Sequence, residues 1–299
     1  MTKVKCDLHI HSTCSDGKID PFDLLKEGER QNLDYISITD HDTIDAYKVL
    51  NDIEKVKSVF SGKLIYGVEA NVLLNNKTLH LLGYGWDYEK FSKYNFLDPE
   101  VYHSRMQKGL DMLIEAGKKV GLKMSDDLKI PYPTKAHHKT FYADISKYEE
   151  NQEIMKNYSM KNTFDFAKDE IVNPNSIFYI PFSVYVPDFY EVANAIHECG
   201  GKVVLAHAFG YVYDGYEVLD DAFNTGLLDG VECHYFFHTK EETDYLVDFC
   251  NKNNLIITGG TDCHGKEMFY KDETFEVQLG HVYVLNEDII LNEDDIKKL

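Results

Sequence analysis

Apolar and polar positions along this chain follow a pattern that predicts β-strands alternating with α-helices. Short apolar runs rich in Val, Ile and Leu are typical of buried strands, and longer segments with apolar residues at helical spacing lie between them. The predicted strands are Lys3–His11, Tyr35–Thr39, Lys63–Glu69, Thr78–Tyr84, Lys202–His207, Gly230–Cys233 and Leu255–Thr261. The predicted helices are Pro21–Asn32, Thr43–Val59, Asp188–Glu198 and Glu241–Asn253.

Strands interleaved with helices in this way indicate an α/β fold made of parallel βα units. The predicted strands carry their polar residues at their carboxyl ends. Barrels and open sheets of this class place their functional sites at that end. We therefore expect the chemistry of this protein at the carboxyl ends of its strands.

One long segment interrupts the pattern, because it contains no convincing strand-and-crossover unit. Within it, Glu100–Val120 predicts a long amphipathic helix, and helical patterning returns around Thr163–Ile171. We predict a main domain of residues 1–99 and 188–299 and a mainly helical insertion of residues 100–187. Such an insertion is commonly a lid over a substrate, and a packing appendage is the alternative.

The composition is that of a globular chain, with 43% hydrophobic and 27% charged residues among 299. No apolar run approaches the ~18 residues of a membrane helix, and the first strand leaves no room for a signal peptide, so we expect a cytoplasmic protein. Six cysteines without a CxxC pair are expected as reduced thiols. The net charge of −20 opposes stable binding of duplex nucleic acid but permits a small anionic substrate. The oligomeric state stays open.

Potential metal ligands gather at the strand ends. His9 and His11 are two residues apart on a strand, so both side chains point to one face, and Asp16 follows in a short loop. A single histidine at such a place is more often structural, but the joint coincidence of so many is improbable. The nine candidate ligands are His9, His11, Asp16, His41, Glu69, His80, His207, Asp262 and His264. Imidazole and carboxylate ligands suit zinc, manganese and iron alike.

These clusters resemble the motifs of the PHP superfamily, named for polymerase and histidinol phosphatase domains. The motifs are Asp7-Leu8-His9-Ile10-His11-Ser12 with Asp16, Thr39-Asp40-His41, Gly67-Val68-Glu69, Leu205-Ala206-His207 and Gly260-Thr261-Asp262-Cys263-His264. The chain is most similar to stand-alone phosphoesterases with a helical insertion between the fourth and fifth strands, which hydrolyse nucleoside monophosphates, 3′,5′-bisphosphonucleotides or short oligonucleotides. The resemblance implies a distorted (β/α)7 barrel, in agreement with the predicted strands.

The resemblance also implies two to three divalent ions, of manganese, zinc or iron. One ion would be held by His9, His11, Glu69 and Asp262, a second by Asp16, His41 and His264, and a third by Glu69, His80 and His207. Asp40 fits as a catalytic-site partner that orients His41 or a neighbour. Direct binding of an ion by Asp40 is the alternative.

Further candidates would contact the substrate. Arg105 begins the insertion, and its planar fork suits a phosphate, with a surface ion pair as the alternative. His137 and His138 fall where similar proteins often have a Gly-Arg-Pro-His segment; the arginine is missing here, and Lys135 could replace its charge. After the sixth strand, His234 and His238 could act as an acid or contact phosphate, or be structural.

We therefore expect a metal-dependent phosphoesterase acting on a nucleoside mono- or bisphosphate or a short oligonucleotide. The expected reaction is attack of metal-bound hydroxide on phosphorus. An amidohydrolase-type metal hydrolase acting on a carbonyl centre is the first alternative, although no lysine is well placed for carbamylation. A non-catalytic metal-binding regulatory protein is the second, and the complete set of ligands argues against it.

Overall fold

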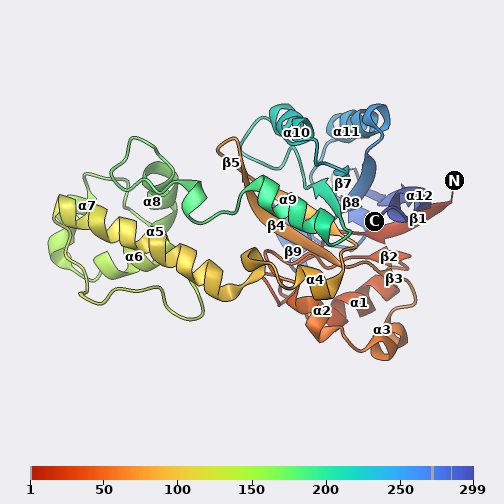
Figure 1. Cartoon of the computed structure of the whole chain (residues 1–299), viewed down its shortest axis with the longest axis horizontal. Helices are drawn as coiled ribbons and strands as arrows, with labels where there is room; N and C mark the ends of the chain where they lie inside the picture. Colours follow the sequence, from red (N-terminus) through yellow and green to blue (C-terminus); the bar gives the residue numbers. More distant parts are fainter. Residues whose placement is uncertain (1, 271–272, 284) are drawn as a thin grey trace. The chain divides into compact units, whose positions relative to one another are not determined.

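The computed structural model describes residues 2–270, 273–283 and 285–299. The chain divides into two compact units, each described by itself below. The main unit comprises Met1–Tyr94 and Asp188–Leu299, and the insertion unit comprises Asn95–Pro187, coloured yellow to green in Figure 1. No helix among the described residues is both long and apolar enough to cross a membrane.

Most strands of the main unit belong to two sheets. The first has the order β13-β1-β2-β3 and the second the order β4-β5-β6-β7-β8. The strands are β1 Lys3–Asp7, β2 Tyr35–Ile36, β3 Lys63–Leu64, β4 Gly67–Leu74, β5 Lys77–Tyr84, β6 Lys202–Leu205, β7 Gly230–Tyr235, β8 Ile256–Gly260 and β13 Ile290–Asn292. Two small hairpins are formed by β9 Glu267–Tyr270 with β10 Glu273–Glu276 and by β11 His281–Val282 with β12 Glu287–Asp288.

The expected α/β class is present, but the described strands do not close into a seven-stranded barrel. The neighbours β1, β2 and β3 are parallel, as are β6, β7 and β8, whereas β5 is antiparallel to both β4 and β6. The reversal comes from the two-residue turn Asn75-Asn76, where both residues have positive φ, the geometry that suits a tight hairpin. Isolated parallel bridges, Ile10 with Cys263 and His41 with Glu69, join the two sheets.

Along the chain the helices of the main unit lie between its strands, except for α12, which follows β13. They are α1 Pro21–Arg30, α2 Asp45–Val49, α3 Ile53–Val59, α4 Tyr88–Phe91, α9 Phe189–Glu198, α10 Gly215–Asn224, α11 Lys240–Asn253 and α12 Glu293–Ile296. The single helix predicted over Thr43–Val59 is wrong, because the chain breaks after Val49 and Asp52 starts a new helix by accepting a hydrogen bond from Lys55 N–H. The sequence pattern also missed α10.

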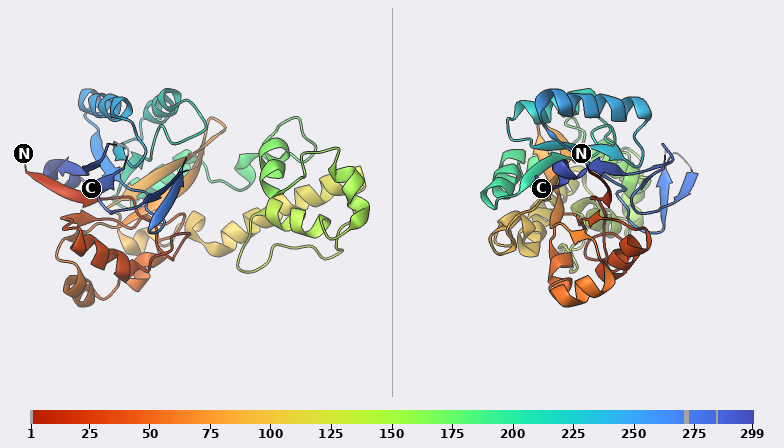
Figure 2. Two further views of the ribbon diagram at one scale, coloured as in Figure 1. Left: turned by 180° about the vertical axis from the view of Figure 1, so that it is seen from behind. Right: turned by 90° about the vertical axis from the view of Figure 1, so that its right-hand side faces the viewer.

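The core of the main unit lies between its sheets. Its fully buried members include Leu8 directly after β1, Leu82 from β5, Val204 from β6 and Ile289 before β13. The first strand is also paired antiparallel with β13, so the two ends of the chain lie side by side in Figure 2. This packing fixes the strand ends from which the candidate ligands project.

The insertion unit is mainly helical and has a hydrophobic core of its own. Its helices are α5 Pro99–Val120, α6 His137–Ile145, α7 Gln152–Met155 and α8 Thr163–Phe166, with single turns at Asn95–Leu97, Glu149–Asn151, Ala167–Ile171 and Phe182–Val184. The predicted helix over Glu100–Val120 is confirmed, and Gly121 ends it with φ of +83°. Leu110, Leu113 and Phe141 are fully buried in the core.

Candidate metal centre

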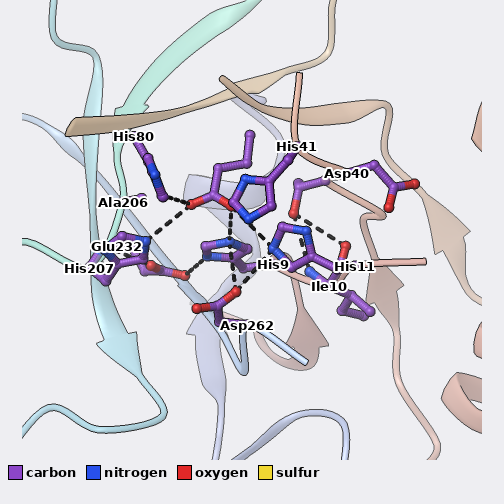
Figure 3. A network of polar contacts seen from close by, with 12 residues as sticks. His9, Ile10, His11, Asp40, His41, His80, Ala206, His207, Glu232 and Asp262 are labelled. Atoms are coloured by element: carbon purple, nitrogen blue, oxygen red, sulfur yellow. Dashed lines mark hydrogen bonds and ion pairs between the residues drawn. The ribbon is translucent and has the colours of Figure 1, made fainter. Parts of the chain in front are cut away.

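Glu69 lies at the middle of a cluster of histidines in the main unit. Its side chain is fully buried, and each of its two oxygens faces a different group of imidazoles. The Oε2 atom is 3.2 Å from His9 Nε2, 3.1 Å from His11 Nε2 and 3.1 Å from His41 Nδ1. The Oε1 atom is 2.7 Å from His80 Nδ1 and 3.1 Å from His207 Nε2. Figure 3 shows these five imidazoles converging from several segments, with His9 and His11 on the same one.

The first group of potential ligands is His9, His11, Glu69 and Asp262. Asp262 Oδ1 lies 3.4 Å from His9 Nε2 and 3.0 Å from His11 Nε2. These are the residues that the resemblance to the PHP motifs implies for one ion. One atom from each of the four residues lies within 4.8 Å of the others, the spacing expected around a single cation.

A second group of potential ligands lies next to the first and combines Asp16, His41 and His264 with His11. Asp16 Oδ1 is 3.3 Å from His264 Nε2, and Asp16 Oδ2 is 3.9 Å from His41 Nε2. A hydrogen bond from His264, helped by the charge of His41, lowers the pKa of Asp16 to about 2. The three ligands expected for the second ion thus lie close together, and His11 lies within the same group.

The third group joins Glu69 to His80, with His41 also within reach. In the β4–β5 hairpin Glu69 pairs with Leu82 and Asn71 pairs with His80, so Glu69 and His80 are diagonal neighbours on one face of the sheet. His207 lies near the same Glu69 oxygen. The antiparallel course of β5 therefore explains why His80, in the middle of a strand, reaches a site formed by strand ends.

The nitrogen and oxygen atoms at this centre fit divalent cations. Several of them are buried and find no hydrogen-bond partner among the described residues. They are His9 Nε2, both nitrogens of His11, His41 Nδ1, Glu69 Oε2, His207 Nδ1 and Asp262 Oδ1. Buried polar atoms left unpaired cost free energy, and a cation bound by their lone pairs would remove that cost. The donor set of imidazoles and carboxylates suits manganese, zinc or iron.

Charges at the centre shift the pKa values of its members in opposite directions. Burial lowers the pKa of His11, but Asp262 and Glu69 outweigh it and raise that pKa to about 9. Burial and repulsion from His11 and His80 lower the pKa of His41 to about 4, against the attraction of Glu69. Burial opposes ionisation of Glu69, yet the surrounding histidines hold its pKa well below the usual range. The centre therefore concentrates negative charge on its carboxylates, as a cation site requires.

The backbone around the centre is held by contacts between the segments that follow β1 and β8. Asp262 N–H donates to His9 O over 2.8 Å, and His11 N–H donates to Cys263 O over 2.9 Å. Gly260 permits this approach, because a Cβ there would lie 2.2 Å from the Cβ of His9. Asp262 and His207 also have positive φ values, +54° and +24°, which residues other than glycine rarely adopt. Such strain is commonly found at functional sites.

The side chain of Asp40 contacts the neighbouring loop that carries Asp16. It accepts hydrogen bonds from Ser12 N–H (2.7 Å), the Ser12 hydroxyl (2.6 Å) and the Ser15 hydroxyl (2.6 Å). Both of its oxygens are therefore occupied by the loop that carries Asp16. These contacts favour a role for Asp40 in supporting the loop over direct binding of an ion, and both roles stay predictions.

A β-bulge in β7 interrupts the regular alternation of side chains between the two faces of this strand. Glu232 pairs with Thr258, but His234 pairs with Gly259, so Cys233 is an extra residue. As a result Glu232 and Tyr235 share the face of the centre, and His234 points to the other face. His238 is buried, and its Nδ1 contacts Cys233 O at 3.1 Å. Neither His234 nor His238 belongs to a group of potential ligands among the described residues.

Two side chains that contact the centre escaped the sequence analysis. Glu232 is fully buried and contacts His9 Nδ1 and His207 N–H. The Tyr235 hydroxyl donates to Asp262 Oδ2 over 3.2 Å. A carboxylate in the middle of an apolar strand, Val231-Glu232-Cys233, was a signal for the first, since a buried carboxylate needs partners.

The predicted substrate-binding residues Arg105, Lys135, His137 and His138 all belong to the insertion unit. Arg105 is half-buried on α5, and Lys135 is exposed just before α6. His137 is buried, with its ring 4.8 Å from that of Tyr185 and 5.4 Å from that of His138. Neither nitrogen of His137 has a hydrogen-bond partner among the described residues. Their contact with a substrate stays a prediction.

Two curated relatives are similar to most of this chain. A protein of Haemophilus influenzae named 5′-3′ exoribonuclease is 26% identical over 88% of this chain and 91% of its own length. A protein of Eggerthella lenta named phosphoribosyl 1,2-cyclic phosphate 1,2-diphosphodiesterase is 25% identical over 87% of this chain and 94% of its own length.

Solved structures and a family pattern complete the comparison. A crystal structure of a candidate metal-dependent phosphoesterase from Bifidobacterium adolescentis has a TM-score of 0.59 at 22% identity, covering 98% of this chain and 94% of that one. An amidohydrolase from Chromobacterium violaceum has a TM-score of 0.56 at 19% identity, covering 91% and 92%. These likenesses show the fold. The PHP domain model matches residues 7–170, more than half of the chain. The resemblance noted in the sequence is thus confirmed, and the chain belongs to the PHP domain family.

Proposed function

We propose that the main unit is a metal-dependent phosphoesterase centre holding two to three divalent ions. The observation that carries this proposal is the convergence of five histidines on the two oxygens of Glu69, with Asp262 and Asp16 beside them. Membership of the PHP domain family and the names of both curated relatives support hydrolysis of phosphate esters.

The side chains of the centre would have different roles in binding the ions. Divalent ions bound here would supply activated water and positive charge for a phosphate group. Glu69, fully buried between two groups of histidines, would bridge adjacent ion positions. Asp262 and Asp16, at either side, would complete the first and second positions. Asp40 would keep the loop of Asp16 in place through Ser12 and Ser15.

The substrate is a small phosphorylated molecule, and the relatives narrow its class. Their names describe a ribonucleic acid degraded from its 5′ end and a ribose cyclic phosphate. Both substrates combine a ribose with phosphate. A nucleoside mono- or bisphosphate or a short oligoribonucleotide is therefore the favoured substrate class for this chain.

The insertion unit would recognise the substrate. Its Arg105 and Lys135 carry positive charge in a chain with a net charge of −20, and a phosphate is the natural partner for an arginine fork. His137 and His138 lie at the start of α6, directly after Lys135. In this proposal the insertion unit acts as a lid over the bound substrate.

The experiment that tests the function is a panel of phosphate esters offered to the purified, manganese-supplemented protein. The panel holds nucleoside monophosphates, 3′,5′-bisphosphonucleotides, 5′-phosphorylated short RNA, a ribose 1,2-cyclic phosphate, histidinol phosphate and sugar phosphates. Released phosphate and chromatographed products identify the bond that is cut. We expect turnover of a ribose-containing member, abolished by EDTA and restored by added manganese.

A negative panel is equally informative. If no phosphate ester reacts while metal analysis shows bound ions, phosphoester hydrolysis is wrong, and hydrolysis at a carbonyl centre becomes the better hypothesis. Turnover that persists in EDTA, with no metal in the protein, would overturn the metal-dependent mechanism itself.

A further inference from the structure

Glu232 makes two contacts beneath the candidate metal centre, one with each of its oxygens. Its Oε1 is 3.0 Å from His9 Nδ1, and its Oε2 accepts a hydrogen bond of 2.9 Å from His207 N–H. The side chain is fully buried on β7, and the bulge that follows it keeps Tyr235 on the same face. None of the ion assignments above gives Glu232 a role, and Glu232 belongs to none of the three groups of potential ligands among the described residues.

The first contact decides which nitrogen of His9 is free. An ionised carboxylate can only accept, so Nδ1 of His9 must carry the hydrogen and donate it. The lone pair then lies on Nε2, the atom 3.2 Å from Glu69 Oε2 and 3.4 Å from Asp262 Oδ1. Only a nitrogen with a free lone pair can bind a metal ion. Glu232 thereby holds His9 in the tautomer that can bind an ion.

The second contact holds the backbone of His207 in an unusual conformation. His207 has a φ of +24°, a backbone conformation that costs free energy for any residue other than glycine. The hydrogen bond from its N–H to the buried carboxylate stabilises that conformation. His207 Nε2 is then placed 3.1 Å from Glu69 Oε1, whereas His9 contacts the other oxygen, Oε2.

We propose that Glu232 is a positioning residue that holds His9 and His207 in their ion-binding orientations, so that one buried carboxylate supports two ion positions. The inference rests on the proposed metal-dependent function of the same site. It adds Glu232, a residue outside the ligand set, and makes ion binding next to each of the two oxygens of Glu69 depend on it.

The direct test is Glu232→Gln, which keeps the shape of the side chain. An amide has one acceptor oxygen and one donor nitrogen, so it cannot accept from both His9 and His207. If the amide nitrogen of the glutamine faces His9, it must donate to His9 Nδ1, and the hydrogen of the ring then lies on Nε2, where an ion would bind. If the amide nitrogen faces His207, it meets the His207 N–H, and two donors oppose each other. Manganese alone is the probe, titrated calorimetrically into metal-free protein, with bound metal counted by mass spectrometry.

We expect manganese binding about tenfold to a hundredfold weaker than in the wild type, with loss at two positions, in a variant that keeps its circular dichroism. His80→Ala, which removes a ligand of the third position alone, should weaken one position. The matched control is Asp144→Asn, a carboxylate that is likewise buried but lies in the insertion unit and accepts from Ser125. It should bind manganese as the wild type does.

Wild-type affinity and stoichiometry in a folded Glu232→Gln variant would overturn the proposal, and loss of only one position would overturn the double role. A second measurement avoids the variant: nitrogen-15 spectra of histidine-labelled wild-type protein loaded with zinc, a diamagnetic ion, report which nitrogen of each ring carries hydrogen. His9 should carry its hydrogen on Nδ1, and an Nε2–H tautomer would contradict the proposal. Manganese binding without phosphoester turnover would leave this inference standing while the proposed function fails.

Discussion

The main unit and the insertion unit both bury histidines, but they surround them differently. In the main unit His11 lies against Glu69 and Asp262, and these carboxylates raise its pKa to about 9 in spite of burial. In the insertion unit His137 lies among aromatic rings, and burial together with the charge of His138 lowers its pKa to about 4. A buried imidazole therefore becomes a candidate ligand through the carboxylates beside it, and burial alone is not enough.

The strongest test of this contrast removes the shared carboxylate of the main unit. Glu69→Gln takes away the negative charge that faces five histidines. We expect loss of bound metal and a fall in kcat/KM of roughly a thousandfold or more, since the ions supply several kcal/mol to the reaction. Metal analysis and the phosphate-release assay measure both effects. Full metal content and wild-type turnover would show that the histidines do not need this carboxylate.

The next test asks whether the insertion unit acts on the substrate. Arg105→Ala should leave the metal content unchanged and lower kcat/KM by about tenfold to a hundredfold, because a charged hydrogen bond contributes about 1.5–3 kcal/mol. The matched control is Arg30→Ala, which removes the chain's other arginine, an exposed partner of Glu27 on α1. Equal kinetics for both variants on every substrate would make the insertion unit a packing appendage.

Both tests start from residues visible in the sequence, and the reason is physical. His9, His11 and Asp262 follow apolar strands, and the fold gathers the ends of such strands at one place. His80 was visible as a residue, but its route to the centre depends on the antiparallel β5, which the repeated apolar pattern could not reveal. The hairpin was signalled only by Asn75-Asn76, a turn in which both residues have positive φ.

Other features depend on contacts between distant segments and could not be predicted from local pattern. The role we propose for Glu232 depends on its contact with His9, which lies 223 positions away in the sequence. Asp40 stands beside a candidate ligand, yet its oxygens are taken by Ser12 and Ser15. The break between α2 and α3 shows the same limit, because the apolar spacing continues through it while Asp52 begins a new helix.

The pH dependence of the insertion unit sharpens the comparison further. The pKa of His137 is lowered to about 4 in the folded chain, whereas an unfolded histidine titrates near 6.5. Between these values the unfolded state binds more protons, so stability falls as the pH falls from about 6.5 towards 4. At pH 5 we expect α6 to be about 1–2 kcal/mol less stable than at pH 7.

Hydrogen exchange of residues 137–145, corrected for the intrinsic effect of pH, measures this change. In His137→Phe the ring no longer titrates, so the difference between pH 7 and pH 5 should largely disappear. Should the wild type protect α6 equally at both values, His137 is not held neutral by burial, and the contrast with His11 fails.

The smallest expected effect comes from the β7 bulge, which brings Tyr235 to the centre in the place that plain alternation would give to His234. The Tyr235 hydroxyl holds Asp262 Oδ2, leaving Oδ1 toward His9 and His11. Tyr235→Phe removes that hydrogen bond alone, and we expect manganese binding up to about tenfold weaker with the fold intact. His234→Gln, one position away on the opposite face, should bind manganese as the wild type does. If His234→Gln is the variant that loses metal, the strand alternates regularly, and the support we assign to Tyr235 belongs to His234.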